Sequence, residues 1–288
     1  MKTTTNPAVD QPAGTAGRRR SDIAVHAVLS FAVLISVTPF IWMILTAFKN
    51  YEESIRIPIS FLPARWDFAN FQVILSKFPF GRFYLNTFTV MIFVILGELA
   101  ISSMAAYAFA RLDFPFKNGI FVFCLSLMMV PGQIFIIPQY DLMVKAGLTN
   151  TIAALILPRI FSVFSTFLLR QFFLGLPRDL DDAAKIDGCS FFGIYFRILL
   201  PLIRPALVSV AILSGLTVWK DLLWPLIVNS SMEKYTLSAG LALLIGEHTT
   251  HFPQVMAGSL MAVTPMIVAF FILQRQFVEG IANSGIKG

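Results

Sequence analysis

Long apolar runs separated by short polar segments dominate the hydrophobic pattern of this 288-residue chain. A helix needs about 20 apolar residues to cross a bilayer. Six runs reach that length, at residues 24–48, 83–110, 119–140, 152–173, 205–228 and 254–278. The pattern therefore predicts an all-α polytopic membrane protein with six transmembrane helices.

One polar block, at residues 176–207, interrupts this pattern between the fourth and fifth apolar runs. Pro177 has no amide hydrogen to donate and should end the helix before it. Asp179 is then placed to cap the start of a new helix, and Gly188 to end it. The block is interpreted as containing a short helix that lies on the membrane surface, with an ordinary loop between spans as the alternative.

The residue types inside this short helix indicate a contact surface. Asp181 and Asp182 fall in the first turn, where the helix dipole favours negative charge. Ala183 and Ala184 follow, and their small side chains would let a partner approach closely. A capped helix with such a face favours docking of another protein.

Composition and charge agree with a membrane protein. The chain is 57% hydrophobic and 13% charged, with a mean hydropathy of +0.76, whereas soluble domains are about 25% charged. Lys and Arg are more frequent on the side that carries the N-terminus, which predicts that both termini are cytoplasmic. The same bias explains the net charge of +6, so the charge does not indicate nucleic-acid binding. Residues 1–22 are rich in Thr, Ala, Gly and Pro and are expected to be a disordered cytoplasmic tail.

Polar and charged residues inside the apolar runs are candidates for a translocation path, because such groups are costly in a membrane. Glu98 lies in the middle of the second run, and Lys220 and Asp221 lie in the outer half of the fifth. Gln133 accompanies a proline and a glycine that break the third run. For Arg159, gating and structural roles both remain open, and a wet subunit seam is the alternative for Glu98.

Two segments resemble enzyme signatures, but both differ from them in spacing or context. The glycine spacing before Lys287 resembles a phosphate loop, but no Ser or Thr follows the lysine and no strand precedes the loop. Glu247, His248 and His251 have the wrong order and spacing for a zinc helix. We expect neither a metal site nor a nucleotide site on this chain.

The polar block resembles the EAA motif of ABC-importer permeases, which reads Glu-Ala-Ala, three residues, Gly, nine residues and Ile-x-Leu-Pro. Here Asp182-Ala183-Ala184 is followed by Gly188 after three residues, and by Ile198-Leu199-Leu200-Pro201 after nine more. Aspartate at position 182 is the one departure. Further short matches to the MalG-type, carbohydrate-importer branch follow in order, at 86–87, 106–111, 131–138, 167–173, 187–190, 224–226 and 274–288.

The resemblance implies a MetI-like or MalG-like permease fold over residues 23–288, with the EAA region at 176–207. It implies a coupling helix that docks on a cytoplasmic ATPase dimer through Asp182, Ala183, Ala184, Lys185, Asp187 and Gly188. By the same resemblance, the C-terminal tail at Gly285 and Lys287 is expected to reach that ATPase.

The expected function is that of the permease subunit of an ATP-driven, binding-protein-dependent importer for a sugar or oligosaccharide, in a bacterial cytoplasmic (inner) membrane. Its implied partners are a second, MalF-like permease chain, the ATPase dimer, which would bind ATP and magnesium, and an extracytoplasmic solute-binding protein. A sugar phosphate such as glycerol 3-phosphate is the alternative cargo. An ion-coupled secondary carrier that uses Glu98 is the alternative mechanism.

Overall fold

The computed structural model describes residues 15–246 and 250–285, with side chains at 25–246, 250–272 and 274. Lys287 and the segment Glu247–Thr249, which carries part of the rejected zinc pattern, lie outside the described residues. Every regular element in the described part is helical, so the predicted all-α class is confirmed. The elements are α1 (Thr15–Ala47), α2 (Tyr51–Ile55), α3 (Ala69–Lys77), α4 (Phe80–Arg111), α5 (Lys117–Leu127), η1 (Gly132–Phe135), α6 (Ile136–Lys145), α7 (Ile152–Ile156), η2 (Leu157–Arg159), α8 (Val163–Gly175), α9 (Asp179–Ile186), α10 (Phe191–Gly193), η3 (Ile194–Leu199), α11 (Leu200–Leu202), α12 (Arg204–Trp219), α13 (Leu223–Val228), η4 (Met232–Lys234), α14 (Leu237–Ala242) and α15 (Phe252–Gly285).

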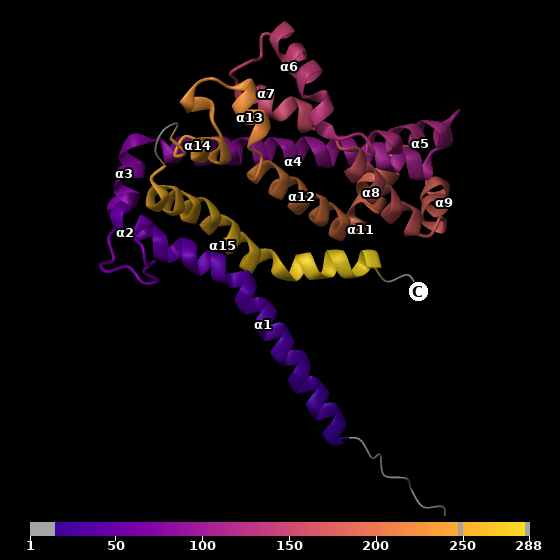
Figure 1. Cartoon of the computed structure of the whole chain (residues 1–288). Coiled ribbons are helices and arrows are strands. Elements are labelled where there is room, and N and C mark those ends of the chain that lie inside the picture. The colour runs from indigo at the N-terminus through magenta and orange to yellow at the C-terminus, as the bar shows by residue number, and fades with distance from the viewer. Residues whose placement is uncertain (1–14, 247–249, 286–288) are drawn as a thin grey trace, which may run out of the picture.

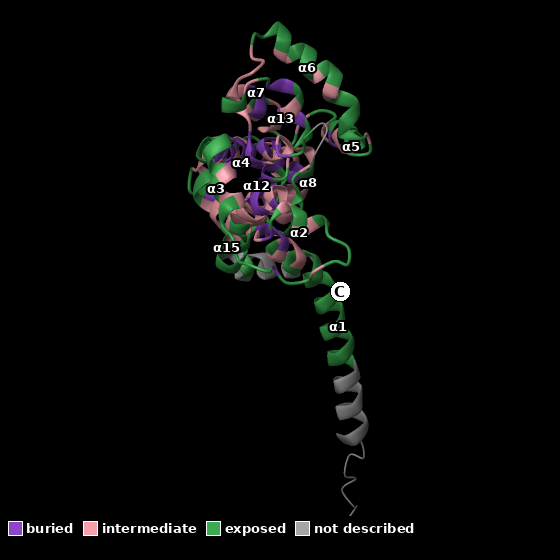
Figure 2. Cartoon of the chain, turned by 60° about the vertical axis from the view of Figure 1, so that its left-hand side comes forward, coloured by how far each residue is buried: buried purple, intermediate pink, exposed green. Residues whose placement is uncertain are grey.

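Helix α4 forms the axis of the molecule. Its 32 residues extend for about 48 Å, and α12 and α8 pack along it. Figure 1 shows α2, α3 and α14 near one end of α4, and α5 and α9 near the other. The buried side chains of α4 recur every three or four positions, from Phe83 through Val90 and Val94 to Glu98. One stripe of this helix therefore faces the core, as the purple ribbon in Figure 2 shows.

Helix α1 leaves most of its apolar surface uncovered. It packs against α15, but its N-terminal part extends away from the other helices (Figure 1). Side chains from Val25 to Phe40 are exposed in this single chain. Such an apolar surface suits lipid or another membrane chain. The helix begins at Thr15, inside the segment 1–22 for which the sequence predicts a disordered tail.

Three predicted spans correspond to single helices, and the remaining long apolar segments form three bent pairs of helices. Helices at 25–47, 80–111 and 252–272 are long and apolar enough to cross a membrane, and they match the first, second and sixth predicted spans. The pairs 117–127 with 132–145, 152–159 with 163–175, and 191–202 with 204–219 are bent by 92°, 43° and 77°. The total is six only if each bent pair is one span.

Two span boundaries from the sequence differ from the structure. The run 119–140 contains the 92° bend, which falls where Pro131 cannot continue a helical hydrogen-bond ladder. The run 205–228 is broken between Trp219 and Leu223, and its first half pairs instead with the preceding segment 191–202. Hydropathy measures the length of an apolar run, whereas a bend depends on local backbone hydrogen bonds.

Candidate functional site

The start of the polar block differs from the sequence-based expectation in one detail. Helix α8 ends at Gly175, just before Pro177, and α9 starts at Asp179. Asp179 is therefore the first helical residue and not the cap. Arg178 holds the N-cap position and makes no side-chain capping bond. The three aspartates Asp179, Asp181 and Asp182 all lie in the first turn, where their charges interact favourably with the helix dipole.

The end of α9 is as predicted. Gly188 has φ +78°, a left-handed conformation that glycine adopts without a steric penalty. The amide of Gly188 donates to the carbonyl of Lys185 at 3.0 Å, and the amide of Cys189 donates to that of Ala184 at 2.9 Å. These two bonds form a Schellman motif, which satisfies the last carbonyls of the helix.

Helix α9 has an inner and an outer face, and they divide the predicted coupling residues. Asp181 and Ala184 are buried, and Ala184 belongs to the core cluster that includes Ile194 and Leu199. The other predicted residues are exposed: Asp182, Ala183, Lys185, Asp187 and Gly188. Ala184 therefore seats the helix on its own chain and does not present its methyl group to a partner.

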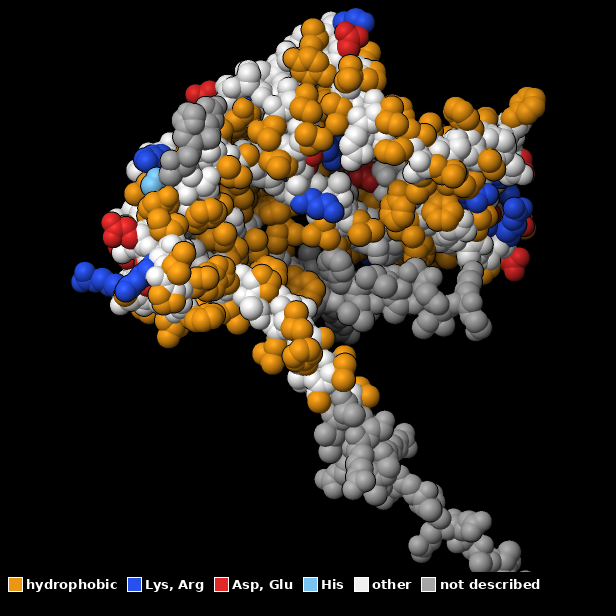
Figure 3. All heavy atoms as spheres, in the orientation of Figure 1, with side chains coloured by type: hydrophobic (Ala, Val, Ile, Leu, Met, Phe, Trp, Pro, Cys, Tyr) orange, Lys and Arg blue, Asp and Glu red, His pale blue; other side chains and the backbone are white. Residues whose placement is uncertain are grey.

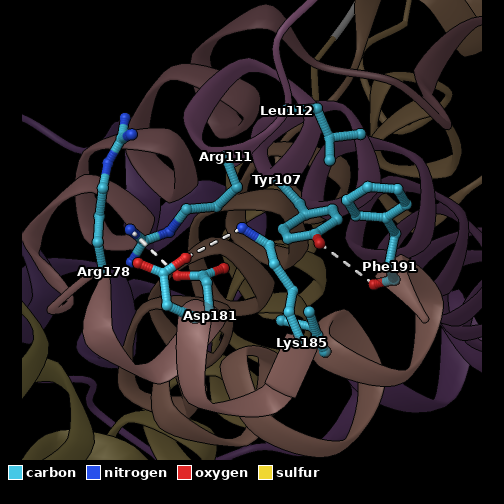
Figure 4. A pocket seen from close by; sticks show the side chains of 9 residues that line it. Tyr107, Arg111, Leu112, Arg178, Asp181, Lys185 and Phe191 are labelled. Carbon is cyan, nitrogen blue, oxygen red and sulfur yellow. Dashed lines mark hydrogen bonds and ion pairs between the residues drawn. The ribbon is translucent and has the colours of Figure 1, made fainter. Parts of the chain in front are cut away.

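An ion pair beneath α9, which the sequence reasoning missed, joins it to the end of α4. Arg111 Nη1 lies 3.4 Å from Asp181 Oδ2, and these side chains are 4% and 9% exposed. Arg111 also donates to the carbonyl of Leu176 at 2.8 Å. Figure 4 shows the Arg111 and Asp181 side chains pointing toward each other in a pocket of about 90 Å³. The clue in the sequence was an arginine at the inner end of an apolar run.

A second contact joins the same two regions. The hydroxyl of Tyr107, one turn before Arg111, donates to the carbonyl of Phe191 at 3.2 Å (Figure 4). Phe191 is the first residue of α10, the next helix after α9, so the segment that follows α9 is also attached to the last turns of α4.

The outer surface around α9 combines charge with exposed apolar side chains. Asp182 and Lys185 form an exposed ion pair at 3.1 Å. Ile186 is 87% exposed, and Phe191 and Phe192 are 60% and 65% exposed. Aromatic and aliphatic anchors within a polar rim are typical of protein interfaces. This surface has the chemistry of a docking site.

A separate cavity of about 490 Å³ lies between α4, α8 and α12. Glu98 and Lys220, two of the residues expected in a translocation path, line it together with Arg159. Asp221 pairs with Arg159 at 2.7 Å. Gln133 does not join them, because it is exposed in η1 and does not line the cavity. Figure 3 shows a small group of charged atoms beside a hollow in the middle of a largely apolar face.

Glu98 is the buried charge of this cavity. It is 6% exposed and makes no ion pair with any described residue. One carboxylate oxygen accepts a hydrogen bond of 2.5 Å from the hydroxyl of Ser165, in the first turn of α8. The positive end of the α8 dipole thus contributes to holding the carboxylate.

The predicted contact at the C-terminus is only partly described. Gly285 is the last residue of α15, and no side-chain contact is described there. Figure 1 shows this helix running alongside the bundle toward the end of the molecule that carries α9.

Comparison with known proteins identifies the family. Residues 98–283 match the family described as binding-protein-dependent transport system inner membrane component. The arabinooligosaccharides transport system permease protein AraQ of Halalkalibacterium halodurans is 38% identical, over 90% of this chain and 94% of AraQ. The lactose transport system permease protein LacG of Rhizobium radiobacter is 32% identical, over 94% and 98%.

Two further comparisons concern cargo and fold. The sn-glycerol-3-phosphate transport system permease protein UgpE of Pectobacterium atrosepticum is 30% identical, over 93% of this chain and 98% of UgpE. A chain of a bacterial ABC transporter involved in the import of the acidic polysaccharide alginate has the same fold, with a TM-score of 0.80 and 20% identity over 92% of this chain and 99% of that chain. The chain therefore belongs to the family of binding-protein-dependent transport system inner membrane components, the permease subunits of ABC importers.

Proposed function

We propose that this chain is the permease subunit of an ATP-driven importer for a sugar or oligosaccharide, and that α9 is its coupling helix. The observation that carries the proposal is the two-faced geometry of α9. Its inner face is attached to α4 through the Arg111–Asp181 pair and is seated on the chain's own core through Ala184, and its outer face is exposed. The energy of ATP hydrolysis would enter through the outer face.

The proposed assembly contains a second permease chain, a pair of cytoplasmic ATPase subunits and an extracytoplasmic solute-binding protein. ATP and magnesium would be bound by the ATPase pair. The exposed apolar surface of α1 is suited to lipid or to the second permease. The bias of Lys and Arg supports cytoplasmic positions for both termini and for α9.

The movement that ATP drives would pass from α9 to α4. Closure of the ATPase pair would move α9, and the Arg111–Asp181 pair and the Tyr107–Phe191 bond would carry this movement to α4. Helix α4 lines the cavity through Val94 and Glu98. A contact made on the cytoplasmic side could in this way change access to the cavity.

The relatives support a sugar as cargo, because those that transport arabinooligosaccharides and lactose are 38% and 32% identical to this chain. Glycerol 3-phosphate is the second candidate, because UgpE is 30% identical. Both cargoes fit the same mechanism of coupling.

Ala183→Arg tests the docking surface. Ala183 is exposed, so the larger side chain leaves the packing of this chain intact and obstructs only a partner. We expect normal membrane insertion, loss of the ATPase subunits on co-purification, and loss of ATP-dependent uptake in proteoliposomes. Ala64→Arg is the matched control, because Ala64 is also exposed and lies in the polar loop between α2 and α3, outside the apolar runs. Wild-type uptake by Ala183→Arg would refute the assignment of α9.

A further inference from the structure

The cavity between α4, α8 and α12 lies where two helices break. Residues 160–162 separate η2 from α8, and residues 220–222 separate α12 from α13. Arg159 ends the first helix and Asp221 lies in the second break, so their ion pair ties the two breaks together. Irregular backbone at membrane depth is tolerated where it is buried in protein or lines a water-filled cavity. Two breaks at one place indicate a wet cavity.

Local contacts maintain this arrangement. The hydroxyl of Ser102 both donates to and accepts from the backbone of Ser162 at 3.3 Å, which satisfies the first break. Gly97 lets that break approach α4, because a Cβ there would lie 2.9 Å from the Ile160 side chain. The hydroxyl of Ser214, which lines the cavity, has no hydrogen-bond partner among the described residues. The cavity lining therefore includes a polar group, the Ser214 hydroxyl, that is available to bind water or a solute.

The charges around the cavity do not suit an anion. A helix N-terminus is a natural binding site for phosphate, but at α8 that end is already in contact with the carboxylate of Glu98, through Ser165. The guanidinium of Arg159 is engaged by Asp221. Among the described lining residues, only the Lys220 cation lacks an ion pair. One unpaired ammonium and one buried carboxylate in the same lining leave no excess of positive charge.

The same groups suit a hydroxyl-rich solute. Each hydroxyl of a sugar both donates and accepts, so it can donate to the carboxylate of Glu98 and accept from the ammonium of Lys220. Thr217 adds an exposed hydroxyl, and Phe161 and Phe164 add rings that are 45% and 44% exposed. Apolar rings with a few convergent polar groups are the usual lining of a small-molecule site.

We propose that this cavity is a binding subsite for uncharged, polyhydroxylated solutes, in which Glu98 accepts and Lys220 donates hydrogen bonds, and that it disfavours sugar phosphates. The inference rests on the proposed importer function and narrows its cargo. It also gives this chain a part in recognising the solute, so that selection does not fall to the partner permease and the binding protein alone.

The test uses the whole importer in proteoliposomes, with its binding protein, and measures ATP-dependent uptake of arabinotriose, lactose and glycerol 3-phosphate. We expect uptake of a neutral sugar, and a loss of about tenfold in Glu98→Gln and in Lys220→Met, because each removes a charge-assisted hydrogen bond. Glu52→Gln and Lys77→Met are matched controls at exposed positions outside the cavity, and their uptake should equal that of the wild type. Normal amounts of inserted protein exclude a folding defect.

A binding measurement gives a second readout that does not depend on transport. Thr217→Cys, in a background with Cys124→Ala and Cys189→Ala, places one thiol in the lining of the cavity. Arabinotriose or lactose should slow its labelling by a water-soluble maleimide, and glycerol 3-phosphate should not. Protection by glycerol 3-phosphate alone, or by neither neutral sugar, would overturn the inference.

The two proposals fail in different ways. ATP-dependent uptake of glycerol 3-phosphate alone, or neutral uptake that Glu98→Gln leaves unchanged, contradicts the subsite but leaves the importer function intact. Uptake of any of these solutes that needs no ATPase partner contradicts the importer function itself, whatever the labelling of Thr217→Cys shows.

Discussion

At the scale of single residues, two neighbouring aspartates of α9 have different tasks. Asp181 is 7% exposed and faces Arg111, whereas Asp182 is exposed and pairs with Lys185. The EAA spacing draws attention to Asp182, but the buried carboxylate is the one that fixes the helix to its own chain. An exposed ion pair contributes about 0–1 kcal/mol, while loss of one partner from a buried pair costs about 3–5 kcal/mol.

The substitution Asp181→Asn should therefore lower the melting temperature of the purified permease and reduce uptake, because it leaves the Arg111 guanidinium buried without a counter-charge. Asp182→Asn is the matched control for stability and should melt like the wild type. The double variant Arg111→Met/Asp181→Leu should recover much of the lost stability, because it buries no unpaired charge. Equal melting temperatures for Asp181→Asn and Asp182→Asn would show that the buried pair has no structural role.

At the scale of elements, the sequence predicted the existence of α9 better than its orientation. Pro177, the acidic first turn and Gly188 mark its ends, and these signals are local. Which face is buried depends on what lies below, and the arginine that selects Asp181 is 70 positions earlier in the chain. The burial of Ala184 has the same cause. Ala183 and Ala184 look alike in the sequence, but only Ala184 packs in the core.

The residues of the candidate cavity, like those of α9, could be predicted from the sequence but their arrangement could not. Glu98, Arg159, Lys220 and Asp221 could be selected from the sequence because charge is rare in apolar runs. Their assembly around two helix breaks could not, since no local pattern pairs residue 159 with residue 221. Gln133 met the same polarity criterion, but the 92° bend removes it from the cavity.

The substitution Gly188→Asp tests whether uptake requires the left-handed turn that ends α9. Any side chain at φ +78° is strained, and the new carboxylate would lie on the exposed docking surface. We expect normal insertion of the protein but an uptake below about a tenth of the wild-type rate, measured with a full complement of ATPase. Gly147→Asp is the matched control, at an exposed glycine outside α9 that has open space and also a left-handed φ, of +65°. Full uptake by Gly188→Asp would contradict the requirement for this turn at the docking surface.

At the scale of the whole molecule, the proposed coupling surface on α9 and the proposed solute cavity are two separate places. Helix α9 lies near one end of α4 (Figure 1), whereas the cavity is lined by Val94 and Glu98, which lie in the middle of α4. The two are joined by one continuous helix, which makes a rigid connection. Under the proposal, one coupling surface could serve importers of different cargo, such as the relatives named for arabinooligosaccharides, lactose and sn-glycerol 3-phosphate.

The central claim, that a partner ATPase drives uptake through this chain, is tested most directly by transport in proteoliposomes that hold the complete importer. Uptake of a neutral sugar should require ATP inside the vesicle together with the ATPase subunits, and should persist when ionophores abolish all ion gradients. Uptake that continues without the ATPase and stops when the gradients are abolished would contradict this account and would make Glu98 the ion site of a secondary carrier.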